Sequence, residues 1–152
     1  MTDVSVENQD QIPSTALWLG LAGAIPFAAS ALGTWLDPDI ARRGIWITLG
    51  LTYGAVILSF LGGIRWGASL VAPYRQRELA LSVLPSLVGW IALILPSAIG
   101  VCLLIGGFLM QALWDVTSVQ TGKLPHWFGR LRMILTTIVV VSLLAILGKL
   151  AL

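Results

Sequence analysis

Four stretches of this chain are too long and too apolar to belong in a small water-soluble domain. Residues 11–36 carry no charged side chain, and neither do residues 44–64 or residues 79–114. A fourth run, residues 133–148, is shorter and is followed by Lys149. A helix needs about 20 apolar residues to cross the hydrocarbon core of a bilayer. The runs therefore predict an integral membrane protein.

Composition supports lipid as the main solvent. Hydrophobic residues make up 57% and charged residues 11% of the chain, whereas about 25% are charged in a typical soluble domain. The net charge of +2 comes from dispersed basic residues, so no nucleic-acid partner is expected. The single cysteine, Cys102, allows neither a disulfide nor a multi-thiolate metal site within one chain.

The amino-terminal segment differs from the rest of the chain. Its first ten residues include Asp3, Glu7 and Asp10 but no Lys or Arg, the reverse of a signal peptide. We expect residues 1–13 to form a polar, acidic tail that is retained. Residues 14–152 are then a single transmembrane helical domain.

The runs predict an all-α bundle of five transmembrane helices. The first span covers about residues 16–35, capped by Ser14 or Thr15, and the second covers about residues 45–70. A single helix over residues 79–114 would reach about 54 Å, so it must break.

The break is expected at Pro96-Ser97. Spans three and four then form a short helical hairpin of residues 79–95 and 98–114. The fifth span starts near residue 131. Four spans with one re-entrant hairpin are the alternative.

Basic residues indicate the orientation of these spans. Six lie on the amino-terminal side and three on the other, a bias that favours a cytoplasmic amino terminus. The larger group is Arg65, Arg75, Arg77, Lys123, Arg130 and Arg132; the smaller is Arg42, Arg43 and Lys149. The expected location is the bacterial inner membrane, with the carboxyl terminus in the periplasm.

Most of the seven tryptophans fall near predicted span ends, as in an interfacial aromatic belt. Trp90 is different because it lies inside the third span. There its indole N–H needs a partner, or a place at a helix contact. Together with Tyr53 it is a candidate for lining a ligand cavity, although packing explains it more simply.

Small residues recur at four-residue spacing in the second span, which lets helix backbones approach closely in a membrane. The two pairs are Gly50 with Gly54 and Gly63 with Gly67. Gly54 and Gly63 are nine residues apart and so fall on opposite faces of one helix. We expect two close-packing faces, one of which can serve a partner or a second copy.

Ionisable residues gather at one edge of the predicted bundle. Span ends bring Arg65 and Trp66 near Glu78, Asp115, Arg130 and Arg132. A charge at membrane depth usually has a specific partner, and the expected pair is Arg65 with Asp115. A structural clamp between helices is one interpretation; binding of an anionic lipid headgroup or of a partner's carboxylate is the other.

No constellation of catalytic residues is visible. The lone His126 lies in a loop and has no second histidine with which to share a metal or haem. Paired carboxylates and a glycine-rich phosphate loop are also missing from the sequence. We expect a non-enzymatic protein with no cofactor and no metal site.

Two segments resemble a known family. They are Ala16-Leu17-Trp18-Leu19-Gly20-Leu21-Ala22-Gly23-Ala24-Ile25-Pro26-Phe27 and, as the more specific one, Tyr53-Gly54-Ala55-Val56-Ile57-Leu58-Ser59-Phe60-Leu61-Gly62-Gly63-Ile64-Arg65-Trp66-Gly67. Both are similar to a small bacterial and mitochondrial membrane-protein family, domain of unknown function 3429, which includes transmembrane protein 69-like proteins. The resemblance implies an energy-transducing membrane and carries over no activity.

Two functions follow as hypotheses. The first is an accessory subunit or assembly factor that contacts a larger membrane complex, respiratory or related. The alternative is a carrier or binder of a small molecule or lipid, with a cavity lined by Trp90, Tyr53 and Arg65. That alternative shares five spans with the tryptophan-rich sensory proteins, but the Trp- and Pro-dense signature of those proteins is not found after the first span.

Overall fold

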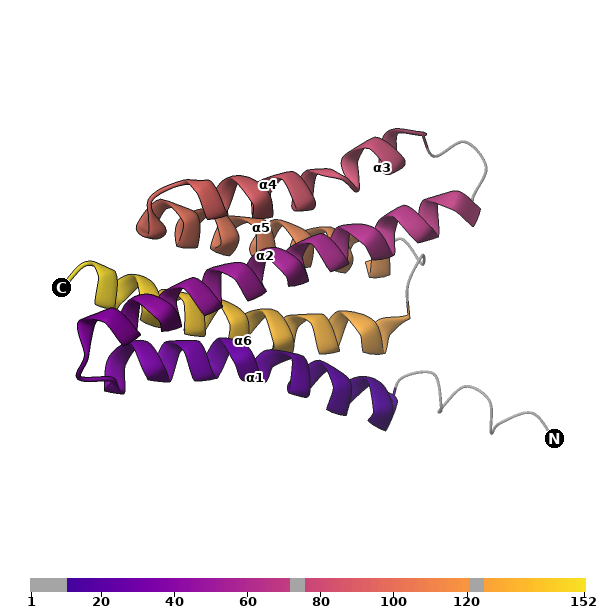
Figure 1. The fold of residues 1–152 in the computed structure, drawn as a ribbon. Helices are drawn as coiled ribbons and strands as arrows, with labels where there is room; N and C mark the ends of the chain where they lie inside the picture. Colours follow the sequence, from indigo (N-terminus) through magenta and orange to yellow (C-terminus); the bar gives the residue numbers. More distant parts are fainter. Residues whose placement is uncertain (1–10, 72–75, 121–124) are drawn as a thin grey trace.

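The chain folds into a bundle of long helices, seen here in a computed structural model that describes residues 11–71, 76–120 and 125–152 (Figure 1). The helices are α1 (Ser14–Leu36), α2 (Ile40–Val71), α3 (Gln76–Leu81), α4 (Leu84–Ile94), α5 (Ser97–Gln120) and α6 (His126–Leu150). The short helix α3 and helix α4 together make one span, Gln76–Ile94, so five segments are long and apolar enough to cross a membrane. The prediction of a five-span, all-α membrane protein is confirmed.

The hairpin of spans three and four is also confirmed. Helix α4 ends at Ile94 and α5 begins at Ser97, so the break falls at Pro96. A proline at this position cannot continue the preceding helix without losing a backbone hydrogen bond. The chain therefore reverses within two residues, and α4 packs back along α5.

The first span ends before Asp37 as predicted, but the predicted end of the fourth span and start of the fifth were wrong. Helix α5 runs on past Asp115 to Gln120, and α6 begins at His126, before Arg130 and Arg132. These charges lie inside helices. The predicted cap was wrong as well, because Pro13 precedes α1 and no side chain at Ser14 or Thr15 caps it.

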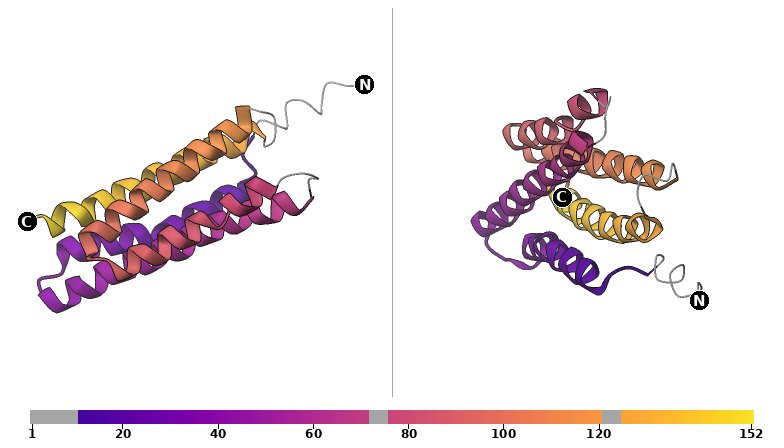
Figure 2. Two further views of the ribbon diagram at one scale, coloured as in Figure 1. Left: turned by 90° about the horizontal axis from the view of Figure 1, so that it is seen from above. Right: turned by 90° about the vertical axis from the view of Figure 1, so that its right-hand side faces the viewer.

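The helices form a closed ring in the order α1, α6, α5, α4, α2 and back to α1, with α2 also touching α5 across the middle. The right-hand view shows α6 lying between α1 and α5 (Figure 2). The core is aliphatic and aromatic. Phe27 of α1 packs edge-on against Tyr53 of α2 and Phe108 of α5, with ring centroids 5.1 and 5.7 Å apart.

Different side-chain contacts join the helices at the two ends of the bundle. At the end that holds the α1–α2 loop, the indole N–H of Trp35 donates to the carbonyl of Ala145 at 2.8 Å, which joins α1 to α6. The Lys149 ammonium lies over the same indole ring at 4.9 Å from its centroid. The opposite end, where α1 begins, is held by the ion cluster described below (Figure 1).

The predicted orientation of the helices depends on six basic residues, and the structure does not describe all of them. Arg75 and Lys123 lie outside the described residues, as do residues 1–10 of the expected acidic tail. The cytoplasmic placement of the amino terminus stays a prediction.

Candidate functional site: a buried ion cluster

Three charged side chains from three helices meet inside the bundle. Nη2 of Arg65 lies 2.5 Å from Oδ1 of Asp115, and Nε of Arg132 lies 2.7 Å from Oδ2 of the same carboxylate. The Arg65 contact is a hydrogen bond as well as an ion pair. The Arg132 contact is close in distance but outside hydrogen-bond geometry at Nε. One carboxylate thus bridges α2, α5 and α6.

This cluster lies below the helix ends. Asp115 is five residues from the end of α5, and Arg132 is six residues from the start of α6. At 1.5 Å per residue these positions are about 8–9 Å inside the bundle end. All three side chains are at least 85% buried, with exposed fractions of 14%, 8% and 9% for Arg65, Asp115 and Arg132. Isolated charges at such a depth are costly, so mutual pairing explains why the sequence tolerates them here.

The aromatic ring of Trp114 covers the Arg65 guanidinium. The guanidinium carbon of Arg65 lies 4.1 Å from the centroid of the Trp114 ring, a cation–π distance. Glu78 of α3 adds an electrostatic attraction to Arg65. Trp66, which the sequence placed beside this guanidinium, is instead 43% exposed on the outside of α2. Trp114 and Asp115 therefore enclose the Arg65 guanidinium.

Arg130 lies apart from the triad. It is exposed, and it lines a shallow surface groove of α5 and α6 together with His126. Residues 130 and 132 differ by about 200° around the helix axis, which places them on nearly opposite faces. The sequence grouped them by proximity along the chain, whereas the helix separates them.

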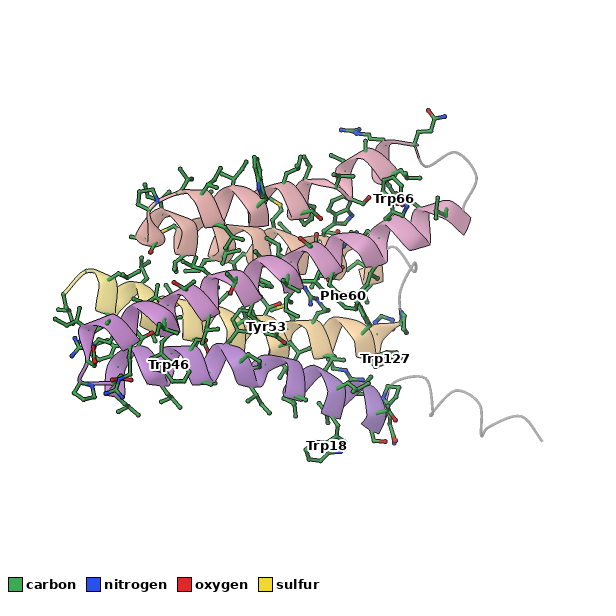
Figure 3. All side chains as sticks on the ribbon, in the orientation of Figure 1. Trp18, Trp46, Tyr53, Phe60, Trp66 and Trp127 are labelled. Carbon is green, nitrogen blue, oxygen red and sulfur yellow. The ribbon has the colours of Figure 1, made fainter. Side chains whose placement is uncertain are left out.

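The cavity expected from Trp90, Tyr53 and Arg65 is not formed by these residues. Trp90 is 61% exposed, whereas the buried residues of α4 are Pro85, Gly89 and Ala92. Tyr53 points between α1 and α2, where its hydroxyl donates to the carbonyl of Gly23 at 2.9 Å (Figure 3). The prediction for Trp90 was wrong. Tyr53 joins two helices through this bond and also lines a surface groove between α1 and α2.

The glycines of α2 divide into a packed set and an open set. A Cβ at Gly50 would lie 2.9 Å from Cδ1 of Ile146, and one at Gly54 would lie 2.8 Å from Cδ1 of Leu104. Helices α6 and α5 therefore approach the backbone of α2 at these points. A Cβ at Gly63 or Gly67 would meet no atom of a described residue within 4 Å. The second face of α2 is open.

Gly62 of α2 packs closely against the start of α4, and it was not predicted from the sequence. A Cβ at Gly62 would lie 2.5 Å from the backbone oxygen of Ser82 and 3.4 Å from Pro85. Gly62 stands next to Gly63 in the sequence, and only the rotation of α2 relative to α4 decides which of the two is covered. A search for glycine pairs four residues apart passes over it.

The arrangement links three helices through one carboxylate. Both oxygens of Asp115 lie against arginines. The cluster therefore fixes the positions of α2, α5 and α6 relative to one another. Nε of Arg65 and Nη2 of Arg132, like Nε of Arg132, are buried without a hydrogen-bond partner among the described residues.

Comparison with known proteins places the chain in a family. Residues 12–148 match the family model described as "Protein of unknown function (DUF3429)". The chain is 37% identical to Transmembrane protein 69 of Xenopus tropicalis over 142 residues and 33% identical to Transmembrane protein 69 of Mus musculus over 137 residues.

Each alignment covers 86% of this chain but only 53% and 54% of the respective relatives, so the chain spans about half their length. No solved structure matches. The arginine, aspartate and glycine positions described above all fall inside the matched range, and the chain belongs to the DUF3429 family of membrane proteins.

Proposed function

We propose that this protein is a non-enzymatic component that acts by lateral contact with another integral membrane protein, as an accessory subunit or assembly factor of a larger complex. One observation carries the proposal: Gly63 and Gly67 form an open glycine face on α2. Both glycines are exposed, and neighbouring Ile64, Trp66 and Leu70 are exposed with them.

A pair of exposed glycines inside a helix lowers the stability of that helix, so their presence calls for an explanation. Each glycine inside a helix costs about 1 kcal/mol relative to alanine. In lipid, helices associate by close van der Waals packing, for which small residues one turn apart provide a groove. Within this bundle the other pair, Gly50 and Gly54, already serves that purpose against α6 and α5. The open pair has the same spacing and is free to receive a helix of another protein.

The ion cluster supports such a contact surface by holding α2 in place. Arg65 follows Gly63 by two residues and is fixed by Asp115 of α5. A surface that is rigid before binding loses less conformational freedom on association. The ion cluster therefore holds α2 in the position in which its open glycine face can bind a partner.

The test is quantitative co-purification from native membranes in a mild detergent, with proteins identified by mass spectrometry. A Gly63→Leu/Gly67→Leu variant should lose a stoichiometric partner protein while keeping its own fold. Gly106→Leu is the matched control, because a Cβ at Gly106 of α5 also meets nothing within 4 Å among the described residues. Recovery of the native chain without a stoichiometric partner would contradict the proposal.

A further inference from the structure

A continuous groove runs along the outer surface between α5 and α6, two helices that lie side by side in both views of Figure 2. Its interfacial part, near the start of α6, is lined by His126 and Arg130. Its deep part continues along the same two helices to Val141. Val116 of α5 and Met133 of α6 line both parts, so the two form one groove, the α5–α6 groove.

Each of the two helices supplies one wall of this groove. Positions three or four apart lie on the same face of a helix, and the wall on α6 follows that spacing at positions 126, 130, 133, 137 and 141. A Cβ at Gly129 would lie 3.3 Å from Cγ2 of Val119, so the helices approach closely beneath the interfacial part. Leu113 and Met133 are exposed on the two walls, so the groove opens to lipid.

The groove changes from polar to apolar with depth. Its polar side chains gather in the interfacial part, where Gln120 joins His126 and Arg130. Its deep part is lined by aliphatic side chains, a methionine and two threonines. The hydroxyl of Thr137 donates to a backbone carbonyl, and the hydroxyl oxygen of Thr136 is not accessible. A lipid has the same polarity profile, with a polar head and an apolar chain.

The length of the groove matches one leaflet of a bilayer. Arg130 and Leu150 are 20 residues apart on α6, a rise of about 30 Å, which is the thickness of the hydrocarbon core. Arg130 therefore lies where the hydrocarbon meets the headgroups. Val141 is 11 residues further along α6 than Arg130, or about 16 Å deeper, and half of the hydrocarbon core is about 15 Å thick.

Charge decides which headgroup fits the interfacial part. The guanidinium of Arg130 is exposed, stays protonated, and presents N–H donors in a planar fork that matches phosphate oxygens. His126, one turn earlier on the same helix face, adds a further N–H donor. Among the described residues that line the groove none is an Asp or a Glu, so the ammonium of a zwitterionic headgroup finds no carboxylate there. A headgroup with net negative charge is therefore favoured.

We propose that the α5–α6 groove binds one anionic glycerophospholipid, with its phosphate on Arg130 and His126 and an acyl chain along the deep part. Basic pockets between transmembrane helices near a membrane surface recognise such headgroups. An isolated interfacial arginine would only extend its charge toward the headgroups, whereas Arg130 stands at the mouth of a groove one leaflet long. The proposal does not depend on the open glycine face, which lies on α2.

The test is native mass spectrometry of the full chain in a nonionic detergent, titrated with palmitoyl-oleoyl phosphatidylglycerol or with palmitoyl-oleoyl phosphatidylcholine. The two lipids share their acyl chains and differ in the net charge of the headgroup. We expect one saturable equivalent of phosphatidylglycerol and at least about tenfold weaker binding of phosphatidylcholine. Equal binding of the two lipids, or no saturable binding of phosphatidylglycerol, would overturn the proposal.

Two glutamine variants test the headgroup contact. Arg130→Gln should weaken the binding of phosphatidylglycerol about tenfold, because it removes the charged donor. Arg77→Gln is the matched control, since Arg77 is exposed on α3 at the same end of the bundle (Figure 1), and it should leave binding unchanged. Equal losses in the two variants would show general attraction to a basic surface and would refute the assignment to the groove.

The acyl-chain contact is tested separately. Val116→Phe narrows the groove where its two parts meet and should weaken lipid binding, whereas Met110→Phe, at an exposed position of α5 outside the groove, should not. Thermal unfolding without lipid checks that both variants keep the fold. Glycerol 3-phosphate, which lacks acyl chains, should not displace phosphatidylglycerol at equal concentration. Displacement would assign the site to a soluble phosphate compound and overturn the lipid assignment.

Discussion

Gly62 of α2 lies directly against the backbone carbonyl of Ser82, where a Cβ would stand 2.5 Å from the oxygen. A Cβ at the neighbouring Gly63 would meet no atom of the described residues within 4 Å. Gly62→Ala should therefore destabilise the protein by about 1–3 kcal/mol through overpacking against backbone that cannot yield. Gly63→Ala should be neutral or slightly stabilising, because alanine favours the helix. Detergent-solubilised thermal unfolding measures both, and equal shifts would show that the α2–α4 contact is placed wrongly.

Asp115 is the shared anion of the ion cluster, so its loss leaves two buried guanidinium groups facing each other. Asp115→Asn should cost about 3–5 kcal/mol of unfolding free energy, as breaking a buried pair does. Arg132→Gln should cost less, since Asp115 still pairs with Arg65. Unfolding by sodium dodecyl sulfate titration gives the values. Asp39→Asn, at an exposed carboxylate, is the control, and an equal loss there would argue against a clamp.

Tyr53 joins α2 to α1 through its hydroxyl. Tyr53→Phe removes the hydrogen bond to the carbonyl of Gly23 and keeps the ring against Phe27. Side-chain hydrogen bonds between membrane helices are worth about 0.6 kcal/mol on average. A loss of this size in thermal unfolding is expected. A loss above about 2 kcal/mol would mean that the ring packing depends on the hydroxyl.

The α1–α2 loop gives the fold a pH dependence. The pKa of the Asp37 carboxyl lies below its ordinary value of 3.8, chiefly because the backbone N–H of Asp39 donates to it. The indole N–H of Trp46 and the charges of Arg42 and Arg43 act in the same direction. This pKa is lower in the folded than in the unfolded chain, so the stabilisation is complete above the unfolded pKa and is lost as the pH falls from that value through the lower pKa of the folded chain.

Asp37→Asn tests that sign. Between pH 7 and about pH 4 the native chain should be the more stable of the two, and the difference should shrink as the pH falls below about 4. Thermal unfolding of both chains across this range isolates the contribution from that of the other carboxylates. Parallel curves down to the lowest pH would contradict the prediction.

The sequence was most informative about which segments span the membrane and least informative about how each helix is rotated about its own axis. Long uncharged runs and Pro96 predicted five spans and the hairpin because both depend only on local composition. Helix ends were wrongly predicted next to Asp115 and Arg132, because pairing lets these charges lie inside helices. Which of Gly62 and Gly63 is covered depends on the contact with α4, and no local pattern contains that information.

The residues of the candidate site were likewise predicted only in part. Opposite charges at adjacent span ends pointed to Arg65 and Asp115, and the structure brings the two together. Trp90 was misplaced because the periodicity of a uniformly apolar helix does not tell a lipid-facing position from a buried one.

The central claim is that the open glycine face of α2 contacts another membrane protein. The most direct measurement is photo-crosslinking in native membranes from a benzoylphenylalanine placed at Ile64, which is exposed beside Gly63. Met110, exposed on α5, is the matched control position. The account predicts one discrete crosslinked product with a different protein from position 64 and none from position 110. Crosslinks from position 64 only to lipid, only to a second copy of this chain, or equally from both positions would contradict it.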